Sequence, residues 1–188
     1  MRFGFLGITL FLSLFSACPA QNPTDGHVEG NAYVNSYFRL SYSWPRILNP
    51  VDNSTLKLPA PSPYANEFLL FAARQGDEPH GVVVLAEKLN VRTPHSTGIR
   101  DGADFLDRLI RGFKPEEQAV ILSRKHFTNA DGIPFDEFDY TTGGEGGEYS
   151  SGIAAQVGAY LIAFKCDAKS SADLAQMTKS IIALHVQK

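Results

Sequence analysis

Cysteine and long apolar runs are scarce in this chain of 188 residues. The only two cysteines are Cys18 and Cys166, so the sequence does not predict a disulfide framework. The apolar run Phe3–Phe15 is shorter than the ~20 residues that a membrane-spanning helix needs. The sequence therefore predicts a domain held together by its own hydrophobic core.

An excess of positive charge is also missing. The chain has 17 Lys and Arg against 20 Asp and Glu, which gives a net charge of −3. A mildly acidic protein lacks the basic surface that binds the phosphates of nucleic acid or the head groups of anionic lipid. Nucleic acid is therefore not an expected partner, and contact with a membrane is expected only through a covalent lipid.

Familiar catalytic signatures are absent from the sequence. It has no Gly-x-Ser-x-Gly motif, and no two histidines lie three or four residues apart, as helical metal ligands do. We therefore expect no catalytic residue, no cofactor and no metal. A loop metal site near His80 and His95 is the alternative. Glu137 and Asp139 are interpreted as the solvated face of a strand. The five histidines are His27, His80, His95, His126 and His185.

The first 20 residues have the organisation of a secretory signal peptide. A positive start, Met1-Arg2, precedes the apolar run, and small residues follow it. Two processing routes stay open. The sequence Leu-Phe-Ser-Ala-Cys ending at Cys18 resembles a lipobox, in which the cysteine takes the lipid. The other route is cleavage after Ala20, which leaves a soluble periplasmic or extracellular protein.

Either route leaves Cys166 without a partner, and its place in an apolar strand predicts that it packs as a small hydrophobic residue. Residues 21–31 are polar and contain proline and glycine without any period, which predicts a flexible tether. The remainder, residues 32–188, has the length of one domain.

Alternating or continuous apolar patterns predict seven strands in this domain. In the first of them, Phe38, Leu40, Tyr42 and Trp44 share one face. The predicted strands are Ala32–Pro45, Glu67–Arg74, Val82–Ala86, Ala119–His126, Phe135–Thr141, Tyr149–Val157 and Ala159–Asp167.

Two helices are predicted from caps and apolar stripes. The first begins after Asp101 and ends before Pro115, and the second begins at Ser170 with Asp173 in its first turn. Short links between strands favour antiparallel hairpins. The sequence therefore predicts an α+β domain in which an antiparallel sheet has helices on both faces.

The segment NAYVNSYFRLSYSWP at residues 31–45 resembles the opening of PsbP-like domains. The segments FDEFDY at residues 135–140 and GAYLIAF at residues 158–164, the latter followed by a helix, resemble later parts of that family. This resemblance implies an α/β/α sandwich. Members of the family are mostly binding or assembly proteins, and many are bacterial secreted proteins or lipoproteins, but the resemblance transfers no site residue.

We therefore expect an exported, non-catalytic envelope protein that binds or helps assemble a partner. The partner is an envelope protein or a small ligand, bound at a sheet edge or at the proline-rich loop Arg46–Asn66. A small-ligand carrier and a periplasmic hydrolase or metal-dependent enzyme are the alternatives.

Overall fold

A computed structural model describes residues 22–53, 67–78, 80–92, 98–144 and 147–187 of the chain. The expected signal peptide, Cys18 and Ala20 lie outside these residues, as do His95 and most of the Arg46–Asn66 loop. The elements in chain order are β1 (Gly26–Glu29), β2 (Ala32–Asn35), β3 (Leu40–Ser43), β4 (Asn49–Pro50), β5 (Glu67–Arg74), β6 (Gly81–Lys88), α1 (Gly102–Gly112), the 3-10 helix η2 (Pro115–Glu117), β7 (Val120–Thr128), β8 (Pro134–Thr142), β9 (Glu148–Val157), β10 (Tyr160–Ala168), α2 (Ser171–Ile182) and β11 (His185–Val186).

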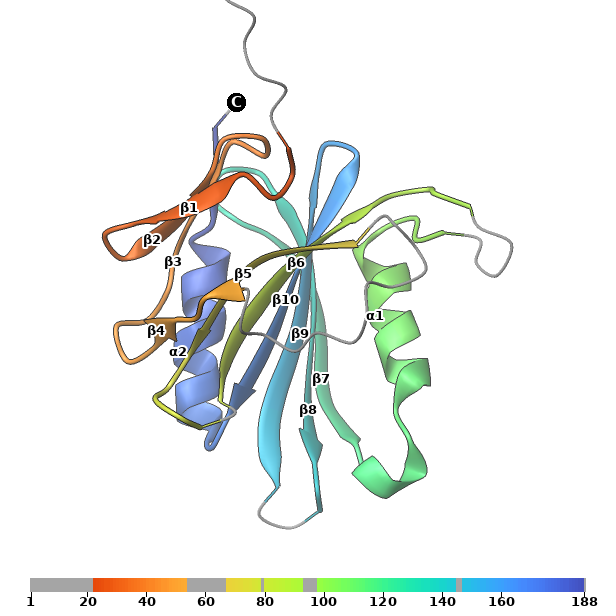
Figure 1. Cartoon of the computed structure of the whole chain (residues 1–188). Helices are drawn as coiled ribbons and strands as arrows, with labels where there is room; N and C mark the ends of the chain where they lie inside the picture. Colours follow the sequence, from red (N-terminus) through yellow and green to blue (C-terminus); the bar gives the residue numbers. More distant parts are fainter. Residues whose placement is uncertain (1–21, 54–66, 79, 93–97, 145–146, 188) are drawn as a thin grey trace, which may run out of the picture.

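A twisted sheet of seven strands forms the centre of the domain (Figure 1). Its order is β4-β5-β6-β10-β9-β8-β7, and every neighbouring pair is antiparallel. The predicted hairpin of β5 and β6 is confirmed, with Arg74 opposite Gly81 at its turn. The turn between β7 and β8 is also confirmed, because Asn129 accepts backbone hydrogen bonds from Asp131 and Ile133.

A second, smaller sheet differs from the sequence prediction. The expected single strand at residues 32–45 is a hairpin of β2 and β3, whose connection contains Arg39 with φ of 53°. Strand β1 lies inside the segment that was expected to be a tether, and it pairs with β2. The expectation of a flexible tether is therefore wrong for Gly26–Glu29. These residues are mostly exposed, and their backbone pairing leaves no apolar pattern in the sequence. Strand β11 completes this sheet on the other side of β3.

The predicted apolar face of the first segment is nevertheless correct. Phe38, Leu40, Tyr42 and Trp44 are all buried in the larger of two core clusters. Trp44 stacks on Phe71 of β5 with ring centroids 4.7 Å apart. The small sheet therefore packs its aromatic face on the large sheet, an arrangement that the sequence pattern did not predict.

Strand β10 divides the core into two clusters. Its residues Ile162, Phe164 and Cys166 join α2 and the small sheet in the larger cluster. The intervening Leu161 and Ala163 join α1 in the smaller cluster. This alternation is the period of two expected for a strand with apolar cover on both sides. Cys166 is fully buried and unpaired, as predicted, and burial raises the pKa of its thiol.

Both predicted helix caps are present. The Asp101 side chain accepts a hydrogen bond from the Asp104 backbone N–H at 2.8 Å, which satisfies an otherwise unpaired donor of α1. Ser170 does the same for Asp173 at the start of α2. The α+β class with antiparallel pairing and two helices is confirmed. Neither α1 nor α2 is long and apolar enough to cross a bilayer, and no other helix in the described residues is.

Candidate functional site

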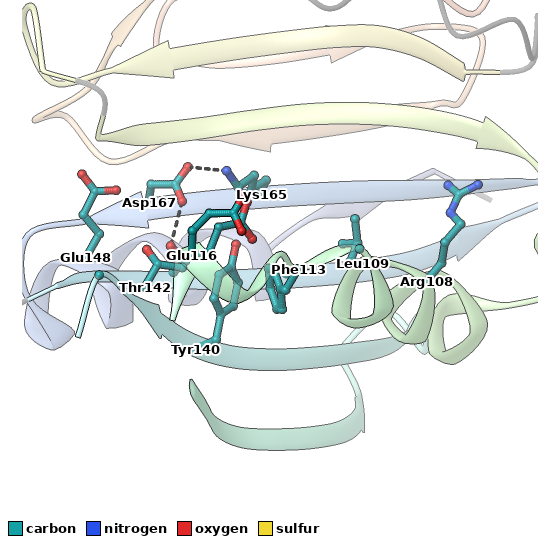
Figure 2. Close-up of a pocket in the computed structure, with 14 residues that line it drawn as sticks. Arg108, Leu109, Phe113, Glu116, Tyr140, Thr142, Glu148, Lys165 and Asp167 are labelled. Carbon is teal, nitrogen blue, oxygen red and sulfur yellow. Dashed lines mark hydrogen bonds and ion pairs between the residues drawn. The ribbon is translucent and has the colours of Figure 1, made fainter. Parts of the chain in front are cut away.

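A cleft of about 570 Å³ lies between α1 with η2 and the adjoining ends of β8, β9 and β10 (Figure 2). Its volume falls within the range of small-ligand sites, about 300–1,000 Å³. The residues that line it are Arg108, Leu109, Gly112, Phe113, Glu116, Glu117, Tyr140, Thr142, Gly143, Glu148, Ser150, Gly152, Lys165 and Asp167.

An apolar wall runs along one side of the cleft. Leu109 belongs to α1, and Phe113 directly follows the last residue of this helix, Gly112. The Phe113 ring packs against Tyr140 of β8 with centroids 4.8 Å apart. Gly152 keeps this region open for aromatic packing, because a Cβ there would lie 2.5 Å from the Phe138 ring. Leu109 remains 36% exposed, so part of the wall faces solvent.

An ion pair forms the polar part of the cleft. The Lys165 Nζ lies 3.3 Å from Asp167 Oδ2, and the Ser150 hydroxyl donates to Asp167 Oδ1 at 2.8 Å. Burial opposes the charge on Lys165, but Asp167, Tyr140 and Glu148 outweigh it and raise the pKa of the ammonium group. Burial also raises the pKa of the Tyr140 hydroxyl. At neutral pH the cleft therefore presents a charged lysine and a neutral phenol.

The two ends of the cleft differ in charge. Arg108 is held by Glu87, whose two carboxylate oxygens accept from the guanidinium at 2.6 and 3.3 Å. Glu148 lies at the other end, Glu116 lies between it and Phe113, and Glu117 also lines the cleft. Figure 2 shows Arg108 and Glu148 at opposite ends, with Leu109, Phe113 and Tyr140 between them.

Three of the histidines singled out in the sequence have separate acidic neighbours, and His95 lies outside the described residues. His80 is buried, with Nδ1 at 3.1 Å from Glu78 Oε2 without hydrogen-bond geometry and Nε2 at 3.5 Å from Glu148 Oε1. His126 Nδ1 lies 2.9 Å from Asp136 Oδ1, and His185 Nδ1 lies 2.7 Å from Asp131 Oδ2. Within the described part of the chain, no group of three or more His, Cys, Asp or Glu residues is arranged to hold a metal ion.

The expected solvated face of β8 is wrong for Glu137. This residue is only 3% exposed, and with Asp139 it lines a smaller cavity of about 170 Å³ beside α2. Lys125 of β7 lies 3.7 Å from Glu137 Oε1 and 3.3 Å from Asp139 Oδ2. The alternation in the sequence is real, but α2 covers the side that was expected to face water.

Opposite pH dependence of stability is expected from these two carboxyls. Burial and the nearby Asp139 raise the pKa of Glu137 above its ordinary 4.5. Burial opposes ionisation of Asp139, but donors from Ser123 and Ser151 and the Lys125 charge lower its pKa below 3.8. Ionisation of Glu137 therefore destabilises the fold as pH rises above 4.5. Protonation of Asp139 destabilises it as pH falls below 3.8.

Urea unfolding of Glu137→Gln and Asp139→Asn across pH 3–7 measures this difference. The difference in free energy of unfolding between wild type and Glu137→Gln should change above pH 4.5, where the wild type loses stability. The difference in free energy of unfolding between wild type and Asp139→Asn should change below pH 3.8, where the wild type also loses stability. Parallel curves for the three proteins would contradict the assigned environments.

Comparisons with known proteins support the fold. No protein-family model matches the chain, and no curated protein sequence matches it. The solution structure of cyanobacterial PsbP (CyanoP) from Synechocystis sp. PCC 6803 is similar, with a TM-score of 0.51 over 92% of this chain and 99% of that chain. The chain has a PsbP-like fold. The 16% sequence identity means that this likeness concerns the fold alone.

A crystal structure from Bacteroides thetaiotaomicron VPI-5482 also aligns, with a TM-score of 0.35 and 16% identity. The alignment covers 86% of this chain and 50% of that one.

Within the PsbP-like fold of our chain, the cleft residues come from α1, η2, β8, β9 and β10, so they are far apart in the sequence. In the sequence, only the apolar stripe of the first predicted helix, which includes Leu109 and Phe113, pointed to any of these residues. That stripe was interpreted as the side of the helix that packs on the core.

Proposed function

We propose that this protein is an exported, non-catalytic binding protein and that the cleft beside α1 receives its partner. The cleft carries this proposal, because it combines an exposed apolar wall with charged side chains at both ends. Concave sites with apolar lining and few polar groups are the usual binding sites of proteins.

The polar groups of the cleft support binding more than catalysis. The Ser150 hydroxyl donates a hydrogen bond to the Asp167 carboxylate, which is itself paired with Lys165. No histidine is among the lining residues that the structure describes, so no imidazole base lies beside this serine in the cleft. Lys165 stays charged because its pKa is raised, which makes it a poor general base. The arrangement therefore favours recognition of a partner.

We further infer that the PsbP-like fold is completed as an α/β/α sandwich. The alternation of β10 residues between the cluster of α1 and the cluster of α2 supports this inference. In such a sandwich the large sheet is covered on both faces, so partners reach it at its edges and at the clefts beside its helices.

Partner capture from envelope membranes tests the proposed site. The matched variants are Leu109→Arg in the cleft and Ile182→Arg on α2, whose side chains are 36% and 37% exposed. We expect wild type and Ile182→Arg to recover the same partner and Leu109→Arg to lose it. Equal recovery by both variants would show that the cleft is not the binding site.

Export is proposed from the first 20 residues, and two mature forms stay open. Mass spectrometry of the N-terminus distinguishes an acylated Cys18 from a free Gln21. Multiple acyl chains stabilise membrane attachment by ~0.8 kcal/mol per buried methylene, so the first form would remain with the membrane fraction. Detection of Met1 in the protein from its native host would contradict export.

A further inference from the structure

The charged groups of the cleft are unequally compensated. Four carboxylates and two cations line it, and both cations are already paired. Arg108 is bound by Glu87, and Lys165 is bound by Asp167. Three carboxylates therefore remain in the cleft, those of Glu116 and Glu117 from η2 and that of Glu148 from the start of β9.

None of these three carboxylates lies within ion-pair distance of a lysine or arginine in the described part of the chain, although Glu148 contributes to the field that keeps Lys165 charged. Glu117 accepts a hydrogen bond from the Lys114 backbone N–H at 3.0 Å, which brings no full charge. Glu148 lies 3.5 Å from His80 Nε2, an interaction that carries charge only when the histidine is protonated. The potential around these carboxylates is therefore negative at neutral pH, and an incoming anion would be repelled.

The apolar wall continues directly from this negative part of the cleft. Leu109, Phe113 and Tyr140 lie along the cleft between Arg108 and Glu148 (Figure 2). An occupant that follows the cleft therefore meets an apolar surface first and carboxylates next. A small cation would use only the second part and would leave the exposed face of Leu109 in water.

We propose that the cleft binds an extended, basic segment of a partner protein, with an aromatic or aliphatic residue two positions away from an arginine or lysine, so that both side chains lie on the same side of the segment. The apolar side chain packs on Leu109 and Phe113, and the cation lies among Glu116, Glu117 and Glu148. This proposal rests on the proposed function and assigns the chemistry of the partner. Charge complementarity and the elongated order of the lining residues carry it.

Matched peptides test the proposal on the purified exported protein by calorimetric titration. The probes are acetyl-Gly-Phe-Gly-Arg-Gly-amide and the same peptide with Gln or Glu in place of Arg. Exposed ion pairs contribute about 0.2–1 kcal/mol each, so three of them predict roughly tenfold tighter binding of the Arg peptide than of the Gln peptide. This preference should shrink several-fold in about 0.5 M salt.

Variants of the cleft give changes of opposite sign. Lys165→Gln leaves Asp167 without its cation, so the Arg peptide should bind several-fold more tightly to this variant. Glu148→Gln should weaken the same peptide several-fold. Glu29→Gln in β1 is the control, since this exposed acid lies outside the cleft and should change nothing. Weaker binding of the Arg peptide to Lys165→Gln would overturn the proposal.

The remaining outcomes separate this proposal from the proposed function. If the Gln or Glu peptide binds as tightly as the Arg peptide and Leu109→Arg abolishes that binding, the cleft is a binding site but not for basic segments. If spermidine binds as tightly as the Arg peptide, the occupant is a small cation and the peptide assignment is wrong. Failure of all three peptides to bind also overturns the assignment, whereas partner capture tests the site itself.

Discussion

Replacement of Phe164 by alanine is expected to lower the free energy of unfolding by about 3–5 kcal/mol. Phe164 is 2% exposed and lies on the face of β10 that packs against α2 and the small sheet. Its ring contacts that of Tyr42 edge to face, with centroids 5.4 Å apart. Alanine would remove these contacts and leave a cavity between the two sheets. Urea unfolding followed by the fluorescence of the buried Trp44 measures the loss.

Val120→Ala is the control for this substitution. Val120 is 55% exposed on the edge strand β7, so its truncation should change stability by less than about 0.5 kcal/mol. A loss below about 1 kcal/mol for Phe164→Ala would mean that the small sheet does not pack on β10 as described.

Gly81→Ala should destabilise the fold by about 1–3 kcal/mol, the usual cost of forcing extra atoms into a packed site. Gly81 begins β6 and lies opposite Arg74 in the hairpin. A Cβ on Gly81 would overlap the backbone carbonyl oxygen of Ala73, which cannot rotate away as a side chain does. The hairpin register or the turn would have to shift.

Gly112→Ala provides the matched glycine control. A Cβ at this position at the end of α1 meets nothing within 4 Å, and the backbone does not have positive φ. Alanine there restricts the unfolded chain and should stabilise the protein by about 0.4–1 kcal/mol. Thermal unfolding of both variants measures these two changes in stability. Equal changes of the same sign would contradict the hairpin geometry described for Gly81.

Local patterns in the sequence predicted most of the large sheet and both helices. The strand over Glu67–Arg74 has the predicted bounds, and Asp101 and Ser170 cap the helices as expected. These elements depend on neighbouring residues, through side-chain alternation and local capping bonds. Strands β1 and β11 escaped prediction because each is short, mostly exposed and held by backbone pairing, with the neighbouring β2 for β1 and with the distant β3 for β11.

The candidate site depended on tertiary arrangement and could not be predicted. The period of two correctly separated Glu137 from Phe138, but it could not show that α2 would cover Glu137. Likewise, nothing local connects Leu109 with Glu148 or Lys165, which share a cleft only after the sheet and α1 have packed. Sequence periodicity distinguishes the two faces of an element and leaves open what each face meets.

The small sheet also sets the direction in which the domain would face. It joins the first strand, β1, to the last, β11, so both ends of the described chain lie at one end of the domain, whereas η2 lies at the other (Figure 1). An acyl chain on Cys18 would attach the molecule by the end nearer to β1. The turn η2, which carries Glu116 and Glu117, would then lie at the end of the domain far from the lipid surface, on the side open to proteins in the compartment.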